Sequence, residues 1–448
     1  MYRGFLKAAL GCLVLVTGPG FVEPALAHAR FETASPAPGA SLQTGPSSIR
    51  LHFNEPVQPV TMRIVDVTGK DLASGLPARA VDADVVLELP DALPTGSYIV
   101  SYRVLSADAH PIAASFDFRV GSASAQDEMA ARAVAGGSEA PAARWAFQLV
   151  VARAAYMFGL LLTAGSVLFM LLVPSVGLRP YLERAVPAYA LFTLLAALAY
   201  LQIGAADMLG SERVPDLGAL RVAAGSSLGT SLGVAAVGLI MLIVGRSHHG
   251  GWLVPAIALL LLSRALTGHP VSREPGWLLM PVMMLHVACA AFWYAALPPL
   301  YLALVRLPPT TVADTVVRFS RVAMLAVAAL LTAGLTMALV HVAGPSAVLG
   351  TWYGQLLVMK STWFSVLLLI ASWHKWSLTP RLLAGEVRAA RRLRASIVVE
   401  GIIMTLVVLI SVNVASTAPE TLPARPVVAG IDGAFEVGLV SGPSGSKP

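Results

Sequence analysis

The sequence predicts a small β-sandwich followed by a polytopic bundle of about eight transmembrane helices. Of its 448 residues, 56% are hydrophobic and only 12% are charged, whereas a soluble chain carries roughly a quarter charged residues. Short alternating segments fill residues 28–120, and long apolar segments dominate from Arg144 onward. The net charge of +6 does not indicate nucleic acid, because the basic residues cluster between apolar segments. The predicted surroundings are a lipid bilayer.

Residues 1–27 have the pattern of a secretory signal peptide. A basic start is followed by an apolar stretch and by a small-residue cleavage site that ends at Ala27. Cleavage there would make His28 the first residue of the exported protein. The two cysteines are Cys12, inside the signal, and Cys289, inside an apolar segment, so the exported domain contains no disulfide and no thiolate site.

The segment 28–120 has the periodicity of β-strands. Apolar and polar residues alternate, and clusters of Pro, Gly, Ser and Asp separate the alternating runs. Several short strands within a hundred residues predict a sandwich. The clearest strands are expected at 49–53, 85–89, 98–104 and 116–120. Residues 121–143, rich in Ala, Gly and Ser, are expected to form a flexible linker.

Residues 144–416 are a series of apolar segments, each long enough to cross a bilayer at about 20 residues. The count of about eight is least certain around 252–268. Trp252, Trp277, Trp352 and Trp376 fall near predicted helix ends, where an interfacial aromatic belt is expected. The predicted helices are 145–173, 186–206, 229–245, 252–268, 277–304, 319–342, 354–374 and 396–416, and the Pro- and Gly-rich tail 417–448 is expected to be disordered.

The basic residues of the loops predict the orientation. If the β-domain is outside, the inner loops carry many arginines and the outer loops only Arg213, Arg221 and Arg273. This positive-inside pattern agrees with the predicted signal peptide. The prediction is a multi-pass protein of a bacterial inner membrane, with its N-terminal domain and its tail in the periplasm.

His28, Asp108 and His110 form the first candidate metal site. After cleavage, His28 would offer both its α-amino and its imidazole nitrogen, and residues two apart on an extended segment point the same way. Three nitrogens and one carboxylate oxygen suit the tetragonal geometry of copper(II). Zinc accepts the same ligand types, and Asp108 could instead bind backbone amides of a turn, so these alternatives stay open.

Four motifs stand out in this domain: His28-Ala29-Arg30, Ser35-Pro36-Ala37-Pro38-Gly39-Ala40, Leu51-His52-Phe53-Asn54-Glu55-Pro56-Val57 and Ser106-Ala107-Asp108-Ala109-His110-Pro111. Together they resemble the periplasmic copper-binding family CopC. The resemblance implies an immunoglobulin-like sandwich with copper(II) in a histidine brace. His28, Asp108 and His110 match the family's ligand positions. Glu55 matches an acidic residue that supports the ligands without binding the metal itself. Ala109 stands where Gly is usual. Met62 is the one methionine of this domain, so we expect no copper(I) site here and expect Met62 in the core.

Histidine and methionine residues within the predicted helices form the second candidate site. His269, His286 and His341 fall in the outer half of the membrane, and His286 is roughly 13 Å deep at 1.5 Å per residue. Met283 precedes His286 by one turn, and Met337 precedes His341 by one turn. Imidazole and thioether together suit copper(I). The alternatives are that the methionines only pack and that the histidines bond neighbouring helices.

The membrane segments also carry ionisable residues and short motifs. Lys360, Arg264 and Glu400 are candidates because buried charges are costly and usually functional. The ordered motifs are Arg264-Ala265-Leu266-Thr267-Gly268-His269, Leu285-His286-Val287-Ala288, Thr332-Ala333-Gly334 and Thr351-Trp352-Tyr353-Gly354-Gln355. Across residues 145–416 they resemble CopD, the membrane partner of CopC, so the whole chain resembles a CopC–CopD fusion.

The resemblance implies copper binding in the periplasm and copper transport across the inner membrane, for uptake or resistance, with periplasmic copper carriers or a reductase as possible partners. No phosphate-binding loop indicates an ATP-driven pump, and we expect no enzyme. Three alternatives remain open: a copper buffer or sensor without transport, a haem-binding or redox membrane protein, and a copper oxygenase like the polysaccharide monooxygenases.

Overall fold

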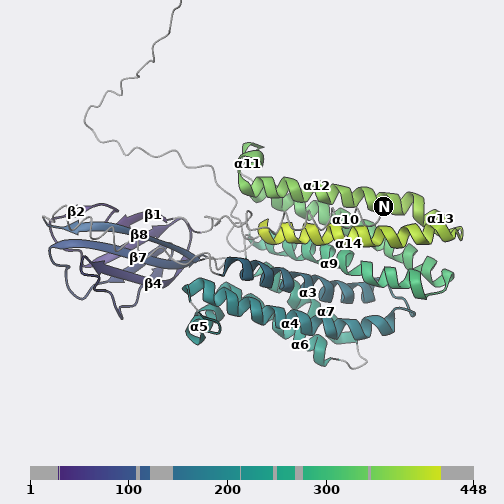
Figure 1. Ribbon diagram of the computed structural model, residues 1–448, viewed down its shortest axis with the longest axis horizontal. Helices are drawn as coiled ribbons and strands as arrows, with labels where there is room; N and C mark the ends of the chain where they lie inside the picture. The colour runs from purple at the N-terminus through teal and green to yellow at the C-terminus, as the bar shows by residue number, and fades with distance from the viewer. Residues whose placement is uncertain are drawn as a thin grey trace, which may run out of the picture.

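The computed structural model describes residues 29, 31–106, 111–121, 145–211, 213–245, 250–267, 276–341 and 345–414. A β-sandwich lies at one end of an elongated bundle of helices that run roughly side by side (Figure 1). The predicted signal peptide, the predicted linker beyond Gly121 and the predicted tail lie outside the described residues.

The sandwich consists of two four-stranded sheets, with strand orders β1-β3-β6-β5 and β2-β8-β7-β4. All pairings are antiparallel except that of β2 with β8. The predicted strands are present: those predicted at 49–53 and 85–89 agree within one residue at each end, and those predicted at 98–104 and 116–120 are two to five residues longer at one or both ends. The strands are β1 Phe31–Ser35, β2 Ser41–Leu42, β3 Ser48–Phe53, β4 Val57–Asp66, β5 Arg79–Val81, β6 Asp84–Glu88, β7 Gly96–Ser106 and β8 Pro111–Val120.

Alternation along each strand builds the core of the sandwich. Ile49, Leu51 and Phe53 of β3 are fully buried, whereas the residues between them reach the surface. Met62 is 7% exposed and packs in the same core, as predicted from the sequence. This face packs in one hydrophobic cluster with Val100, Val104 and Phe118 of the second sheet.

The helices after the sandwich alternate in direction, as the apolar segments predict. Seven are long and apolar enough to cross a membrane, and α7, at 13 residues, is shorter. The helices are α3 Ala146–Leu172, α4 Arg179–Leu209, α5 Leu217–Gly225, α6 Ser227–Val244, α7 Leu253–Ala265, α9 Gly276–Arg306, α10 Pro309–His341, α11 Pro345–Gly350, α12 Trp352–Trp373, α13 Thr379–Leu383 and α14 Val387–Val414, with the short turns η2 Gly250–Trp252 and η3 His374–Leu378.

Helix α7 explains the uncertain count around residues 252–268. Its 13 residues span about 20 Å, less than the hydrocarbon core of about 30 Å. It nevertheless packs between α6 and α9 and continues the alternation of direction. Among the described residues, seven helices therefore have the length of a full membrane crossing, and α7 is an eighth, shorter helix that runs beside them. The helices α5, α11 and α13 are short pieces between them.

The two ends of the bundle differ in charge. Ser175, after α3, hydrogen-bonds Thr315 near the start of α10, so these helix ends meet away from the sandwich. The same end of the bundle carries Arg179, Arg184, Arg306, Arg318, Arg321, Lys375, Arg381, Arg388, Arg391, Arg392 and Arg394. We call it the basic end, and the opposite one the sandwich end. Trp252 and Trp376 lie near the basic end and Trp277 and Trp352 near the sandwich end, all exposed at the surface.

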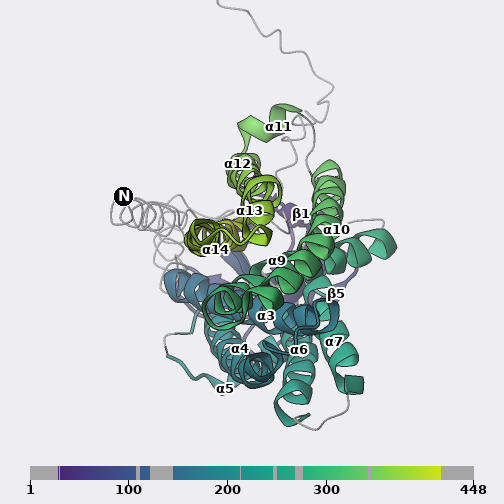
Figure 2. The same cartoon turned by 90° about the vertical axis from the view of Figure 1, so that its right-hand side faces the viewer.

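The bundle core forms two clusters joined by α3 and α9. One includes α3, α4, α6 and α7, and the other includes α9, α10, α12 and α14. Gly165 of α3 makes the close approach between α3 and α9, because a Cβ there would overlap the Ala291 carbonyl. Figure 2 shows the same packing along the bundle, with α3 beside α9.

We expect Gly165→Ala to lower the free energy of unfolding in detergent by about 1–3 kcal/mol, because the new methyl group forces α3 and α9 apart. The matched control is Gly233→Ala on α6, where an added Cβ meets nothing within 4 Å. That change should leave stability unchanged or raise it slightly, since Ala favours helix. Equal melting behaviour of the two variants would contradict this account of the α3–α9 contact.

Candidate metal centre

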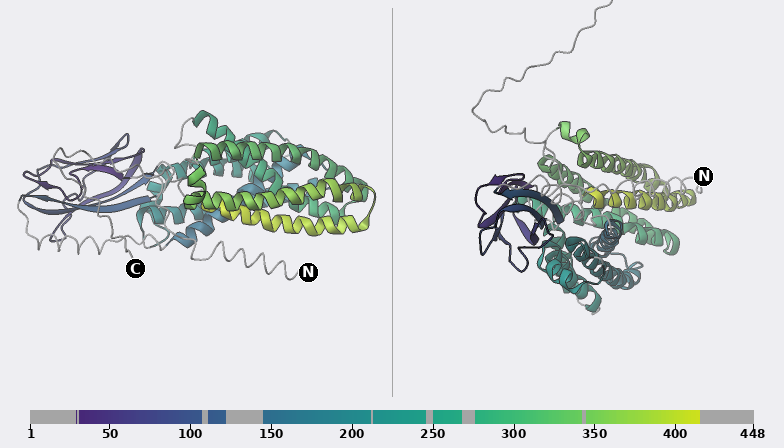
Figure 3. Two further views of the ribbon diagram at one scale, coloured as in Figure 1. Left: turned by 90° about the horizontal axis from the view of Figure 1, so that it is seen from above. Right: turned by 60° about the vertical axis from the view of Figure 1, so that its left-hand side comes forward.

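The segments that carry the predicted copper(II) ligands start from one end of the sandwich. Phe31 pairs with Phe53, and Val57 pairs with Ser106, so β1, β3, β4 and β7 have an end there. Leu105 pairs with Pro111 on β8 at the same end. The strands thus bring five segment ends together, although they lie far apart in the sequence. Figure 3 shows the sandwich at its end of the bundle from two further sides.

Glu55 is the one predicted residue of this site that the structure describes. It is half-buried in the turn between β3 and β4, at the end just defined. His28, Asp108 and His110 lie outside the described residues. His28 precedes Phe31 by three residues, and Asp108 and His110 fall between Ser106 and Pro111, so all three attach to the same end.

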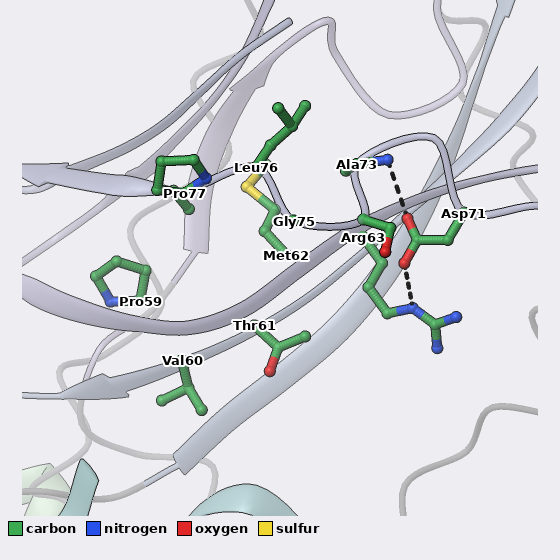
Figure 4. A pocket seen from close by; sticks show the side chains of 12 residues that line it. Pro59, Val60, Thr61, Met62, Arg63, Asp71, Ala73, Gly75, Leu76 and Pro77 are labelled. Atoms are coloured by element: carbon green, nitrogen blue, oxygen red, sulfur yellow. Dashed lines mark hydrogen bonds and ion pairs between the residues drawn. The ribbon is translucent and has the colours of Figure 1, made fainter. Parts of the chain in front are cut away.

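The sandwich also has a groove on its surface. Figure 4 shows a groove of about 410 Å³ between β4 and the segment 71–78. Arg63 donates a hydrogen bond to Asp71 at 2.9 Å within it, so the two charges neutralise each other. The buried Met62 sulfur faces the same groove from the core side. Among the described residues, no cluster of three or more His, Cys, Asp or Glu side chains is arranged to hold a metal.

The sandwich packs directly on the bundle through the end that carries Glu55. Leu105 is 1% exposed and belongs to the hydrophobic cluster of α3, α4, α6 and α7. Arg103 donates hydrogen bonds of 3.2 Å to the backbone carbonyls of Asp207 and Met208 at the end of α4. Burial in this contact lowers the pKa of Arg103, and the Asp207 charge opposes that effect. We call this contact between β7 and α4 the dock.

His286 lies inside the bundle, ten residues after the start of α9 and about 15 Å from the sandwich end. Its ring faces α10, because a Cβ on Gly334 would lie 3.5 Å from Cε1 and 3.7 Å from Nδ1. The Nδ1 atom is buried with no hydrogen-bond partner of ordinary geometry among the described residues. The Leu330 backbone and the Lys360 side chain are the polar groups near it. A buried imidazole nitrogen without such a bond is available to a ligand.

The other predicted residues of the membrane site are only partly described. Met337 lies on α10 one turn beyond Gly334, and His341 is the last residue of that helix. The Met283 side chain packs against the cluster of α3, α4, α6 and α7, whereas the His286 ring faces α10. The two side chains therefore have different neighbours. His269 lies outside the described residues, between α7 and α9.

Glu400 takes part in a buried polar group nearer the basic end. It is 3% exposed, and Trp293 of α9 donates a hydrogen bond of 2.8 Å to its Oε1 atom. His374 Nδ1 lies 3.5 Å from Glu400 Oε2, and its Nε2 atom is 2.6 Å from the Ser396 hydroxyl. Glu400 was a candidate from the sequence, whereas its partners Trp293, His374 and Ser396 were not; they come from α9, η3 and α14.

Cys289 and Arg103 were also not assigned to a site from the sequence. Cys289 is a free, buried cysteine three residues after His286 on α9, and this spacing could have drawn attention to it as a soft group near the predicted path. Nothing in the sequence marked Arg103, because its role depends on a contact with residues more than a hundred positions away.

Comparisons with known proteins agree with this architecture. A model of the CopC domain family matches residues 31–121, and a model of the family described as copper resistance protein D matches residues 313–414. The copper transport protein CutJ of Bacillus subtilis (strain 168) is 27% identical over 379 residues, which cover 78% of this chain and 68% of the relative. Protein YobA of Escherichia coli (strain K12) is 30% identical over 99 residues, which cover 21% of this chain and 79% of the relative.

A solved structure also aligns with the N-terminal part of the chain. CopC from Methylosinus trichosporium OB3b is 30% identical, covering 21% of this chain and 93% of its own, with a TM-score of 0.19. One matched family is thus described by copper resistance and one relative by copper transport. The long apolar helices indicate a multi-pass membrane domain.

Proposed function

The chain belongs to the family in which a CopC domain is joined to a CopD domain, and from that premise we propose that it captures copper(II) outside the membrane and passes copper inward. His28, Asp108 and His110 hold the copper(II) ion at the end of the sandwich. Glu55 orients one of these ligands from the adjacent turn. The proposal gives the chain no catalytic step of its own.

The dock is the observation that carries this proposal. The strand ends flanking the three ligands belong to the end of the sandwich that packs on the bundle, since Leu105 enters the bundle core and Ser106 follows it. Copper released there is delivered to the sandwich end of the helices. A buffer or sensor needs no such contact between its metal-bearing end and a membrane bundle.

The route through the bundle begins at the sandwich end and leads to His286. His341 ends α10 at that end, and His286 lies about 15 Å deeper on α9. The buried Nδ1 atom of His286 is suited to copper(I), for which imidazole is a good ligand. Copper therefore travels as copper(I), after a reductant outside the chain supplies one electron to the copper(II) ion. A protonated Lys360 repels this cation, so Lys360 must be neutral or turned away when copper is bound.

The orientation follows from the charges at the two ends. The basic end carries most arginines and lysines, and the positive-inside rule puts that end in the cytoplasm. The sandwich then lies in the periplasm of a bacterial inner membrane. With this orientation, the predicted removal of residues 1–27 exposes the amino group of His28 on the side where copper is captured.

Arg103→Ala tests whether the dock serves delivery. We expect copper uptake by cells to fall severalfold, because the sandwich loses its hydrogen bonds to the end of α4, while the copper(II) affinity of the purified protein stays unchanged. Arg63→Ala is the matched control, since its partner Asp71 lies within the sandwich. Equal copper uptake in the two variants would show that the dock does not contribute to copper delivery.

A further inference from the structure

The polar group around Glu400 is not explained by copper binding. Both nitrogens of His374 are already engaged, with Ser396 on one side and Glu400 on the other. Trp293 occupies one carboxylate oxygen of Glu400. A metal ion would have to break these contacts to reach a ligand atom. A proton needs no such change, because it moves along hydrogen-bonded groups.

A cavity of about 240 Å³ borders this group. The charged or titratable side chains that line it are Glu400 from α14 and His374 and Lys375 from η3. The lining residues of α9 and α10 are uncharged, and Lys375 donates a hydrogen bond of 3.1 Å to Ser320 of α10. A lysine ammonium in the cavity disfavours a bound copper ion. A proton needs no ligand set of its own, because it can pass between hydrogen-bonded groups and water.

The local backbone also sets this place apart. His374 begins η3, a π-helical turn of five residues after the long α12 helix. Such turns insert an extra residue into a helix and occur often at functional positions. This turn places His374 against α14, where Ser396 and Glu400 lie one turn apart. Figure 2 shows α9, α10, α12 and α14 grouped around this end of the bundle.

We propose that Glu400 and His374 form a proton-transfer pair, and that the bundle exchanges a proton through this pair for each copper ion that it moves. This inference rests on the proposed function. The proton is transferred between Glu400 Oε2 and His374 Nδ1, with Ser396 accepting from or donating to Nε2. Only O–H and N–H bonds form and break, and water in the cavity supplies or takes the proton. The 3.5 Å separation is longer than a hydrogen bond, so the two groups approach each other during transfer.

Electrostatics connects the pair with the copper route. Trp293, which holds Glu400, follows His286 by seven residues on α9, about 10 Å along the helix. Two added positive charges at this separation repel each other in a low-dielectric bundle. Occupation of His286 by copper therefore favours release of the proton, and departure of copper favours its return. The exchange keeps the net charge inside the bundle constant.

The test uses the full chain in liposomes that contain a pH dye and a copper indicator. Copper(I) is supplied outside on a weak chelator, and potassium with valinomycin holds the membrane potential at zero. We expect the lumen to become alkaline as copper enters, whichever way the protein is inserted. Glu400→Gln should reduce the pH change per copper ion at least about fivefold, the lower range of a coupling effect.

Glu386→Gln is the matched control, since Glu386 is an exposed acid just before α14 and should retain the full pH change. His374→Gln provides a second variant if Glu400→Gln does not fold. Two results would overturn the proton pair alone. One is a normal pH change per copper ion in Glu400→Gln, and the other is normal copper entry without any pH change in the unmodified protein. Absence of copper entry in the unmodified protein overturns the proposed function as well.

Infrared difference spectroscopy between two pH values gives a readout that does not depend on transport. A buried carboxyl group that exchanges a proton produces a carboxylic C=O band, and we expect this band to disappear in Glu400→Gln. A purely structural Glu400, fixed by Trp293, would produce no titrating band. That result would overturn the proposal even if transport fell in the variant.

Discussion

His28→Ala is expected to weaken copper(II) binding by more than about 100-fold. This loss exceeds the usual effect of removing a residue that only hydrogen-bonds to a metal ligand. The change removes the imidazole that chelates the metal together with the α-amino group. Binding is measured by competition with a chromophoric chelator on the purified, processed protein, whose N-terminal residue is first identified by sequencing.

The control for this prediction is His52→Ala. His52 is a half-buried histidine of β3 whose Nδ1 atom lies 2.6 Å from Asp84, and we expect its removal to leave copper(II) affinity unchanged. Glu55→Gln should have an intermediate effect of about 10-fold, because it disturbs a ligand without removing one. Equal affinities for His28→Ala and His52→Ala would rule out the predicted ligand set.

His286→Ala is expected to reduce copper(I) transport by at least about tenfold, the scale of a single lost metal-ligand interaction. The structure places its Nδ1 atom inside the bundle, without a hydrogen bond of ordinary geometry to any described residue. The copper(II) affinity of the sandwich should not change, because the two sites are separate. Transport is measured with the full chain in liposomes, at matched protein content.

Leu285→Ala is the matched control for His286→Ala. Leu285 is the preceding residue on α9 and is 47% exposed on the outer surface of the bundle, where its loss disturbs no internal contact. A variant Gly334→Val gives an independent check, since a side chain there meets the His286 ring at about van der Waals distance. Normal transport in both His286→Ala and Gly334→Val would exclude this part of α9 and α10 from the route.

The sequence predicted the strands well because their burial alternates. Residues 49–53, for example, show the apolar and polar alternation that the structure then buries on one face of β3. The pairing of β2 with β8 could not be predicted, because β2 has only two residues and joins its neighbour in parallel. Such short strands carry almost no periodicity.

Hydropathy located the membrane helices but not their ends. Helix α10 begins at Pro309, ten residues before the predicted 319, and α14 begins at Val387 instead of 396. These extra turns are polar and basic, so they lie outside the apolar window that reveals a membrane segment. Helix α5, between α4 and α6, was not predicted because its nine residues are too few to stand out in a search for membrane-crossing segments.

The partners of Glu400 were beyond sequence reasoning. Trp293, His374 and Ser396 come from α9, η3 and α14, and only the folded bundle brings them together. The sequence indicated that Glu400 is costly to bury, but it did not indicate which groups offset that cost. The same limit applies to His286, whose neighbour Gly334 is distant in sequence.

Copper accumulation in cells at limiting copper tests the central claim most directly. Cells that make the intact chain are compared with cells that lack it and with cells that make His286→Ala at the same membrane level. We predict that cytoplasmic copper rises with the intact chain and returns to the level of the protein-free cells with His286→Ala. Equal cytoplasmic copper in all three, with copper(II) still bound by the purified sandwich, would contradict inward transport and identify the chain as a copper buffer or sensor.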